Sequence, residues 1–286
     1  MYVSLDIGGT TTRIAFSKNF IAFEDVIKYP TPQSFNEFVF ELNTHLLSCP
    51  EPITNISLGI AGIINRIDQK ILRCPNIKEI ENLGPYDLIH DVKRASQVLP
   101  QKNTLSKAKI LIENDAALAA LAEAHTGKAK SFNRVAYITA STGIGGSLII
   151  NKKIQDTVFN LEPGHHFINY TQEIGRTWED IASGTSFTKR FGVKPDNTND
   201  SNIWNSYVNY LASGLHNISL MWRPDIIVIG GSIAKKSDLF LIKLQKKLNE
   251  SLGETRPEIT TSAIGDDNGL VGGFINLKSA LIRVSK

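Results

Sequence analysis

Twice along the chain, a strand-like run, a glycine-rich turn and a second strand-like run follow one another. The first such segment covers residues 2–16 and has Gly8-Gly9-Thr10 at its centre. The second covers residues 135–150 and has Thr142-Gly143-Ile144-Gly145-Gly146 at its centre. Glycines between strand-like runs are typical of hairpins. Because glycine lacks a Cβ atom, the backbone N–H groups of such turns can approach a phosphate closely. Two such turns suggest two clamps on one polyphosphate.

Helical patterns alternate with further strand-like runs. Apolar periodicity predicts helices over 34–48, 116–124 and 208–221, and a last helical stretch after 265–267. Strands are expected at 56–60, 110–112 and 226–229, while the segment 65–106, which contains three prolines, is expected to be irregular. This alternation predicts an α/β architecture. The length of 286 residues suits two lobes or one large one.

Charge and composition exclude several classes of function. The formal net charge is +3, and the basic residues are scattered rather than clustered, so we expect no nucleic-acid partner. No apolar run approaches the roughly 20 residues needed to cross a bilayer, so no membrane partner is expected. No leader pattern opens the chain, and we expect a cytoplasmic protein. The two cysteines, Cys49 and Cys74, have no spacing typical of a disulfide framework or a zinc site.

The first glycine turn lies in the run from Asp6 to Arg13, which also contains three threonines. Hydroxyl and guanidinium groups add donors for a phosphate, and Asp6 could contact a hydrated Mg²⁺, which prefers carboxylate oxygens. The second turn fits neither the P-loop nor the dinucleotide pattern. The alternative for each turn is a tight hairpin in which the glycines serve geometry alone.

A carboxylate stands between a strand-like run and an alanine-rich helix, in the sequence Asn114-Asp115. Both residue types are favoured helix N-caps, and capping is the simplest reading. However, the carboxyl end of a strand in an α/β sheet often faces the ligand. Phosphoryl transfer needs a carboxylate that accepts the proton of the attacking hydroxyl group. Asp115 is therefore the candidate catalytic base.

Six short motifs in this order resemble the ROK family, which contains sugar kinases and sugar-responsive repressors of the actin/hexokinase/Hsp70 superfamily. They are Asp-Ile-Gly-Gly-Thr, Gly-Ile-Ala-Gly, Glu-Asn-Asp-Ala, Thr-Gly-Ile-Gly-Gly, Ala-Ser-Gly-Thr and Ile-Gly-Gly-Ser. The resemblance implies a two-lobed actin-like ATPase fold of the ribonuclease H-like type, with a nucleotide and sugar cleft between the lobes. The N-terminal lobe would cover 1–113 and the C-terminal lobe 114–286, with a final helix near 269–286 packing back on the first lobe.

The resemblance also implies roles for individual residues, with Asp115 as catalytic base. The first phosphate loop would comprise Asp6, Gly8, Gly9, Thr10, Thr11 and Thr12. The second loop would comprise Thr142, Gly143, Gly145 and Gly146, and the adenosine side Gly230 and Gly231. The sugar-binding residues would be Gly62, Asn76, Asn114, Asp115, Glu162, His165 and Glu179.

The implied activity is ATP-dependent phosphorylation of a hexose or N-acetylhexosamine at the 6-hydroxyl, as in a glucokinase. ATP and Mg²⁺ would be the cofactors, with Mg²⁺ arriving on the nucleotide and no metal bound by protein ligands alone. A homodimer is expected. The alternative is a sugar-sensing, non-catalytic or repressor-type member. Repressors of the family place a helix-turn-helix domain before the first loop, and a loop that begins at residue 6 leaves no room for it.

One departure from the family concerns zinc. Typical members carry a Cys-x-Cys-Gly-x-x-Gly-Cys segment that binds structural zinc with a histidine, whereas residues 170–177 here contain no cysteine. Zinc prefers thiolate and imidazole ligands in closed sites. With only His165 and His166 nearby, we expect no zinc. His165 remains a candidate sugar ligand, and His166, as a lone histidine, is expected to be partly exposed and without function.

Overall fold

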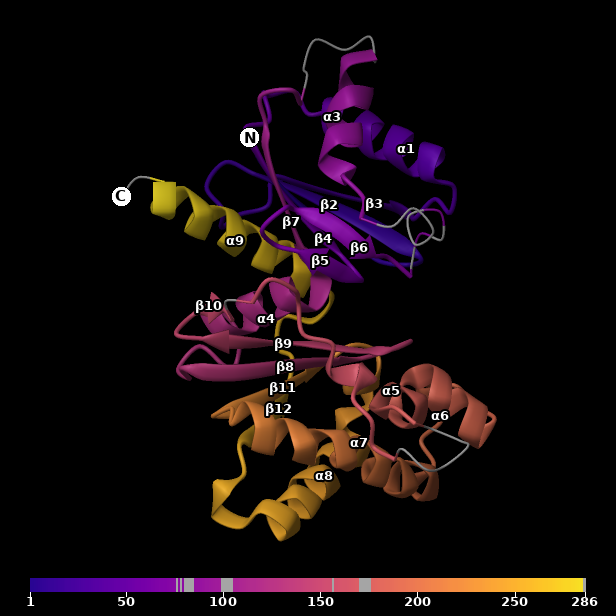
Figure 1. The fold of residues 1–286 in the computed structure, drawn as a ribbon. Coiled ribbons are helices and arrows are strands. Elements are labelled where there is room, and N and C mark those ends of the chain that lie inside the picture. Colours follow the sequence, from indigo (N-terminus) through magenta and orange to yellow (C-terminus); the bar gives the residue numbers. More distant parts are fainter. Residues whose placement is uncertain are drawn as a thin grey trace. The chain divides into compact units, whose positions relative to one another are not determined.

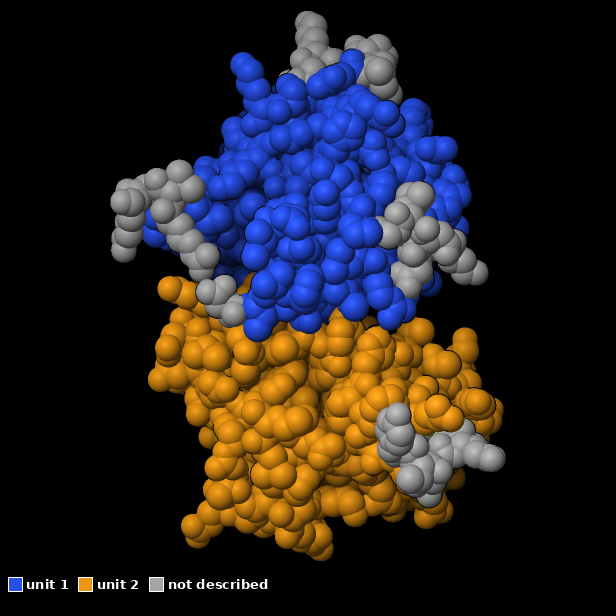
Figure 2. All heavy atoms as spheres, viewed as in Figure 1, with its two compact units in different colours: residues 1–122, 156–160, 267–286 blue, residues 123–155, 161–266 orange. Residues whose placement is uncertain are grey.

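The computed structural model describes all residues except 76, 78, 80–84, 99–104, 156, 170–175 and 285–286. The chain forms two compact units (Figure 2). Unit 1 contains residues 1–122, 156–160 and 267–286, and unit 2 contains residues 123–155 and 161–266. Unit 1 thus extends beyond the lobe boundary expected at residue 113 and includes the last helix.

Unit 1 is built on a five-stranded sheet with the order β3-β2-β1-β4-β7. The strands are β1 (Tyr2–Ile7), β2 (Thr11–Ser17), β3 (Asp25–Pro30), β4 (Asn55–Ile60) and β7 (Lys109–Asn114). The first three form an antiparallel meander, and β4 and β7 run parallel to β1. The carboxyl ends of β1, β4 and β7 therefore meet at one edge of the sheet. A short ribbon of β5 (Ile63–Asn65) and β6 (Lys70–Arg73) follows β4.

Helices cover both faces of this sheet (Figure 1). Helices α1 (Phe35–Leu47) and α3 (Leu88–Val98) share a hydrophobic core with Ile14 of β2. Helix α9 (Asn268–Val284) contacts the neighbouring residue Ala15. Because successive strand residues point to opposite faces, the two sets of helices lie on opposite sides of the sheet. Helix α4 (Asp115–His125) begins directly after β7, and its last residues belong to unit 2.

The prolines of the segment 65–106 led us to expect irregular structure, and this prediction was wrong. It contains β6 and the eleven residues of α3. Leu88 and Val92, one turn apart in α3, are almost fully buried. The prediction was wrong because the prolines on either side, Pro85 and Pro100, drew attention away from the short apolar stripe of this helix.

Unit 2 repeats the sheet plan of unit 1 without a visible sequence repeat. Its order is β10-β9-β8-β11-β12, again an antiparallel meander followed by two strands parallel to the first. The strands are β8 (Arg134–Ala140), β9 (Ile144–Ile150), β10 (Lys153–Ile154), β11 (Ile226–Gly230) and β12 (Glu258–Thr261). The two predicted glycine turns therefore join the first two strands of each sheet, β1 to β2 and β8 to β9.

The helices of unit 2 are α5 (Trp178–Ala182), α6 (Gly184–Phe191), α7 (Ser201–Trp222) and α8 (Ser237–Leu252). Short 3-10 segments are Pro163–His165, Pro195–Asn197, Ile233–Lys236, Gly253–Thr255 and Gly265–Asp267. Stacked and edge-on rings of Phe187, Trp204, Tyr207 and Phe240 form the centre of the core. Within the part of the chain that the structure describes, no helix combines the length and apolar character needed to span a membrane.

The glycine pair Gly272-Gly273 in α9 allows this helix to approach its neighbours closely. A Cβ atom on Gly272 would lie 1.8 Å from the backbone oxygen of Leu118 in α4, and one on Gly273 would lie 2.0 Å from Oγ of Ser4 in β1. The first contact involves a backbone atom, which cannot move aside as a side chain can. Gly272 therefore sets the spacing between α9 and α4, the helix that begins at Asp115.

We predict that Gly272→Ala lowers the free energy of unfolding by about 1–3 kcal/mol, because overpacking at a backbone contact outweighs the gain in helix propensity of about 1 kcal/mol. Urea unfolding measures the change. Lys278→Ala, at an exposed position of the same helix, serves as the control and should change stability by less than about 0.5 kcal/mol. A more stable Gly272→Ala protein would contradict the close approach.

Candidate active site

The first glycine turn joins β1 to β2, and its carbonyl groups are bound from one side. Thr31 donates its hydroxyl to the oxygen of Gly8 (2.7 Å) and its N–H to the oxygen of Thr10 (3.1 Å). The side-chain amide of Gln33 donates to the oxygen of Gly9 (3.2 Å). In a trans peptide the N–H points opposite to the C=O. The N–H groups that follow Gly8 and Gly9 therefore point away from Thr31 and Gln33, as an anion-binding turn requires.

The three threonines of this turn differ in their surroundings. Thr10 is exposed and Thr11 half-buried. Thr12 is fully buried, and its hydroxyl contacts the hydroxyl of Thr31 at 2.9 Å. Thr12 thus supports the residue that fixes the turn.

Asp6 and Arg13 lie opposite each other in the β1–β2 register. The guanidinium of Arg13 pairs with the carboxylate of Asp6 and also with that of Asp267 (3.2 Å). A Cβ atom on Gly269, in the first turn of α9, would lie 2.7 Å from Cγ of Asp6. The positive end of the helix dipole favours a carboxylate there. Arg13 therefore lies beside the glycine turn with a carboxylate on each branch of its guanidinium.

Asn114 and Asp115 lie at the junction of β7 and α4, as the sequence predicts. The side-chain oxygen of Asn114 accepts from the N–H of Ala117 (3.1 Å), and its amide donates to the oxygen of Gly62 (3.1 Å). Asn114 is thus the helix cap and also brings Gly62 to the junction. The half-buried carboxylate of Asp115 accepts from the N–H of Ala116 (2.8 Å). Asn76 lies outside the described residues.

Sequence reasoning missed Glu113, which precedes this pair. Its carboxylate is buried and receives two parallel hydrogen bonds from Arg66, at 2.7 Å and 2.9 Å. Arg66 also donates to the backbone oxygens of Thr157 and Phe159. This bidentate pair fixes the residues before Asp115 against segment 157–160. A glutamate directly after the apolar run of residues 110–112 was the available signal.

The second glycine turn, in unit 2, is held in the same way as the first. The N–H of Gly184 donates to the oxygen of Ser141 (2.6 Å), and the hydroxyl of Thr185 donates to the oxygen of Thr142 (2.8 Å). The Ala-Ser-Gly-Thr motif thus binds the carbonyl side of the turn, and the N–H groups of Thr142 and Gly143 point the other way. The turn is shorter than the motif, since Gly145 and Gly146 lie within β9.

Glu179 reaches the second turn from α5. Its carboxylate accepts the N–H of Ile144 at 2.6 Å, and a Cβ atom on Gly143 would lie 2.5 Å from the same carboxylate oxygen. Helix α5 begins with a capping box between Thr177 and Asp180. Hydrogen bonds from the backbone and then the hydroxyl of Thr177 lower the pKa of Asp180. This cap fixes the start of the helix and with it the direction of Glu179.

Glu162 precedes a 3-10 turn (Pro163–His165) that ends at His165 and packs on the start of β9. Oε2 of Glu162 lies 3.5 Å from Nδ1 of His165. A Cβ atom on Gly164 would lie 2.1 Å from the oxygen of Ile144. Ile144 therefore contacts both this turn and Glu179, so the structure brings the three predicted sugar ligands of unit 2 to one end of β9.

Gly230 and Gly231 lie at the carboxyl end of β11, beside the carboxyl end of β8. Gly230 pairs with Thr139. Gly231 has a φ of 82°, and a Cβ atom there would lie 2.5 Å from the oxygen of Ala140. Only glycine fits this position without strain. The residue pair predicted for the adenosine side thus adjoins the residues that lead into the second turn.

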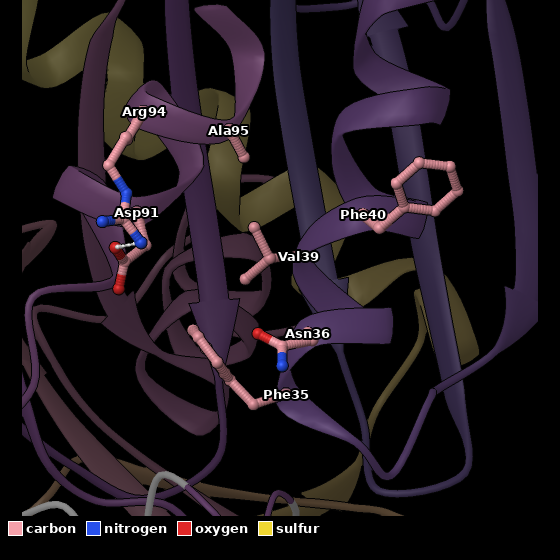
Figure 3. A pocket seen from close by; sticks show the side chains of 7 residues that line it. All are labelled: Phe35, Asn36, Val39, Phe40, Asp91, Arg94 and Ala95. Carbon is pink, nitrogen blue, oxygen red and sulfur yellow. Dashed lines mark ion pairs between the residues drawn. The ribbon is translucent and has the colours of Figure 1, made fainter. Parts of the chain in front are cut away.

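A hollow of about 480 Å³ lies elsewhere in unit 1, between α1 and α3 (Figure 3). Its lining residues are Phe35, Asn36, Val39, Phe40, Asp91, Arg94 and Ala95. It contains none of the predicted site residues, and we do not assign the site to it. Among the described residues no group of three or more His, Cys, Asp or Glu side chains is arranged to hold a metal ion.

Comparison with known proteins agrees with the sequence motifs. The model of the ROK family matches residues 2–280. An N-acetylgalactosamine kinase of Shewanella sp. (strain ANA-3) is 24% identical over 312 residues, covering 96% of each chain. The xylose repressor of Bacillus subtilis (strain 168) is 25% identical over an alignment of 270 residues that covers 82% of this chain and 66% of the repressor.

The crystal structure of a ROK family glucokinase from Streptomyces griseus, in complex with glucose and AMPPNP, has a TM-score of 0.77 with this structure. The identity is 22%, and the match covers 96% of this chain and 98% of that one. The predicted α/β fold of the actin-like ATPase type is therefore confirmed.

We predict that Glu179→Ala loosens the second glycine turn, because the N–H of Ile144 loses a charged acceptor. Hydrogen bonds to charged groups contribute about 1.5–3 kcal/mol, so local exchange of the Ile144 amide should accelerate about 10- to 100-fold. Hydrogen exchange followed by NMR measures this rate. Glu250→Ala, which removes an exposed carboxylate of α8, is the control and should leave the Ile144 rate unchanged. Equal protection of Ile144 in all three proteins would contradict the role of Glu179.

Proposed function

Since the chain belongs to the ROK family, we propose that it is a sugar kinase that transfers the γ-phosphoryl group of ATP to a hexose or N-acetylhexosamine, at the 6-hydroxyl. The observation that carries this proposal is the position of Asp115. Its carboxylate stands at a strand-to-helix junction fixed by the cap of Asn114 and the Arg66–Glu113 pair. The kinases of Shewanella and Streptomyces support the same class of reaction.

The proposed reaction is a direct transfer of the γ-phosphoryl group from ATP to the sugar oxygen. Asp115 accepts the proton of the sugar hydroxyl, and the sugar oxygen forms a bond to the γ-phosphorus. The bond from that phosphorus to the bridging oxygen breaks, and ADP leaves with the electron pair. In its ionised form the carboxylate of Asp115 can accept this proton.

The two glycine turns are proposed to bind the phosphates. Their carbonyl groups are occupied by Thr31 and Gln33 in unit 1 and by Gly184 and Thr185 in unit 2. Their N–H groups are therefore oriented before the nucleotide arrives and need no rearrangement, which is how preorganised donors stabilise developing charge. Gly230 and Gly231 are proposed to adjoin the adenosine.

A divalent cation fits the donors near the first turn. Asp6 and Asp267 offer carboxylate oxygens, the ligand type that Mg²⁺ prefers. Because Arg13 pairs with both carboxylates, we propose that Asp6 contacts the hydrated ion through water while the nucleotide holds it. Bound with the nucleotide, Mg²⁺ would supply positive charge that offsets the charge of the phosphates, and Asp6 would hold its water shell.

The sugar is proposed to bind to carboxylates, amides and one imidazole. Glu162, His165 and Glu179 come from unit 2. Asn114 retains one amide hydrogen for a hydroxyl group after its bond to Gly62, because an amide nitrogen has two donors. Gly62 and Asn76 complete the proposed set. A site that hydrogen-bonds several hydroxyls discriminates strongly against sugars that lack them.

The second candidate is a sugar-responsive protein without kinase activity. It is favoured by the 25% identity with the xylose repressor of Bacillus subtilis over 82% of this chain. Such a protein would bind a sugar without sugar-dependent release of ADP.

We predict that one sugar in a panel of hexoses and N-acetylhexosamines drives ADP release from Mg-ATP in a coupled assay. Asp115→Asn should lower kcat by about 10²–10⁴-fold, because it removes the general base, and should change the sugar KM by less than about 3-fold, because uniform binding is kept.

Asp238→Asn is the matched control, since Asp238 is an exposed aspartate in the first turn of α8. It should leave kcat unchanged. Full activity in Asp115→Asn would exclude Asp115 as the base. Sugar binding by calorimetry without ADP release would favour the second candidate instead.

A further inference from the structure

The turn that carries Glu162 and His165 continues into His166, and both ring nitrogens of His166 have partners. Nδ1 lies 2.5 Å from the backbone oxygen of Pro163, and Nε2 lies 3.2 Å from the side-chain nitrogen of Asn217 in α7. A carbonyl oxygen only accepts, so Nδ1 carries the hydrogen. In the neutral ring Nε2 is then the acceptor for Asn217. The expectation that His166 is a lone histidine without partners was therefore wrong.

Trp178 closes this arrangement on the other side. Its ring centroid lies 5.6 Å from that of His166, and its backbone N–H donates to the oxygen of His166 (3.0 Å). The indole is fully buried and donates to the oxygen of Tyr210 (3.1 Å). A Cβ atom on Gly214 would lie 2.0 Å from the indole, so the ring lies directly on α7.

Gly214 and Asn217 are three residues apart and lie on one face of α7. On this face Gly214 packs against Trp178, and Asn217 hydrogen-bonds to His166. His166 adjoins His165 in sequence, and Trp178 adjoins Glu179. The backbone also closes here, because Phe167 pairs with Thr177 and the N–H of Ile168 donates to the oxygen of Arg176 (2.9 Å).

The donors in this region do not fit the zinc site that the family resemblance implies. Residues 161–183 contain no cysteine, and the two cysteines of the chain, Cys49 and Cys74, are buried in unit 1. Thiolate ligands for a structural zinc ion are thus absent from unit 2. The ring nitrogens of His166 are already used by Pro163 and Asn217.

We propose that His166, Asn217 and Trp178 form a metal-independent anchor that positions Glu162, His165 and Glu179 for the sugar. We call these three residues the imidazole anchor. The role of His166 is that of a positioning residue, which acts through the groups it holds and does not touch the substrate. This proposal rests on the proposed sugar-kinase function, of which it deepens the sugar-binding part.

The first test compares His166→Ala with the wild-type protein in steady-state kinetics. Each lost hydrogen bond weakens positioning by a factor of about 2 to 10, so the sugar KM should rise by about 10-fold or more. The KM for Mg-ATP should stay within about 2-fold, because Gly184 and Thr185 still bind the carbonyl groups of the second turn. A parallel rise of both constants would indicate a merely structural role and overturn the proposal.

The matched control is His216→Ala. His216 is the residue before Asn217 on the same helix, and its ring nitrogen Nδ1 lies 3.1 Å from the hydroxyl of Ser251 in α8. Its removal should leave both KM values unchanged. Asn217→Leu should reproduce most of the His166→Ala effect, and the double variant should be no worse than the more impaired single variant, because both changes break the same bond. Additive effects would contradict the His166–Asn217 link.

The second test concerns metal. Purified wild-type protein should contain far less than one zinc ion per chain by elemental mass spectrometry. Treatment with EDTA, followed by its removal and return of Mg²⁺, should leave the melting temperature and the sugar KM unchanged. Stoichiometric zinc together with loss of sugar affinity after EDTA would overturn the metal-independent anchor.

A third readout separates this proposal from the proposed function. Hydrogen exchange followed by mass spectrometry on peptides covering 161–169 and 176–183 needs no substrate. His166→Ala should lose protection in both peptides, and His216→Ala should not. If no sugar drives ADP release, the kinase proposal fails while this loss still supports the anchor. Unchanged protection in an active kinase overturns the anchor alone.

Discussion

The direction of the carbonyl groups in two glycine turns is the constraint on which the candidate site depends. A glycine turn by itself has no preferred partner, and its N–H groups are as free to bond to the protein as to a ligand. Here Thr31 binds the first turn through Gly8, and Gly184 and Thr185 bind the second. Planar trans peptides then point the N–H groups the opposite way. A short loop thereby becomes an oriented set of donors.

The same device occurs in both units because the two sheets share one plan. Each begins with an antiparallel hairpin whose turn is rich in glycine, and each continues with parallel strands whose carboxyl ends lie beside that turn. The supporting groups differ, however. A threonine hydroxyl serves in both units, but it is joined by a glutamine amide in unit 1 and by the first backbone N–H of α6 in unit 2. Proposed phosphate binding requires the carbonyl groups of the turn to point away from the ligand. Several chemical groups can bind these carbonyls and so keep them in that direction.

The proposed sugar-binding part shows a similar substitution of one chemistry for another. A structural zinc ion fixes a loop by four strong bonds and needs thiolates, which this region lacks. The imidazole anchor instead fixes this region by two hydrogen bonds of His166 and by the close packing of Trp178 against Gly214. Each contact is weak, but all three converge on one face of α7. One face of α7 is packed into the core of unit 2, so this helix offers a fixed reference for the residues next to His166 and Trp178.

Sequence alone determined the α/β class, both hairpins, the strand-to-helix junction at Asp115 and the family. Periodicity, glycine spacing and short motifs involve residues that are close together in the sequence, so they can be recognised without a structure. It missed α3, whose apolar stripe is short, and it counted Gly145 and Gly146 as turn residues. It also gave His166 no partner and assigned no role to Glu113. Tertiary structure decided the last two points. Asn217, the partner of His166, lies 51 residues from it in the sequence, and Arg66, the partner of Glu113, lies 47 residues away. Hydrogen-bond partners at such separations leave no periodic trace in a sequence, since they depend on where folded elements meet.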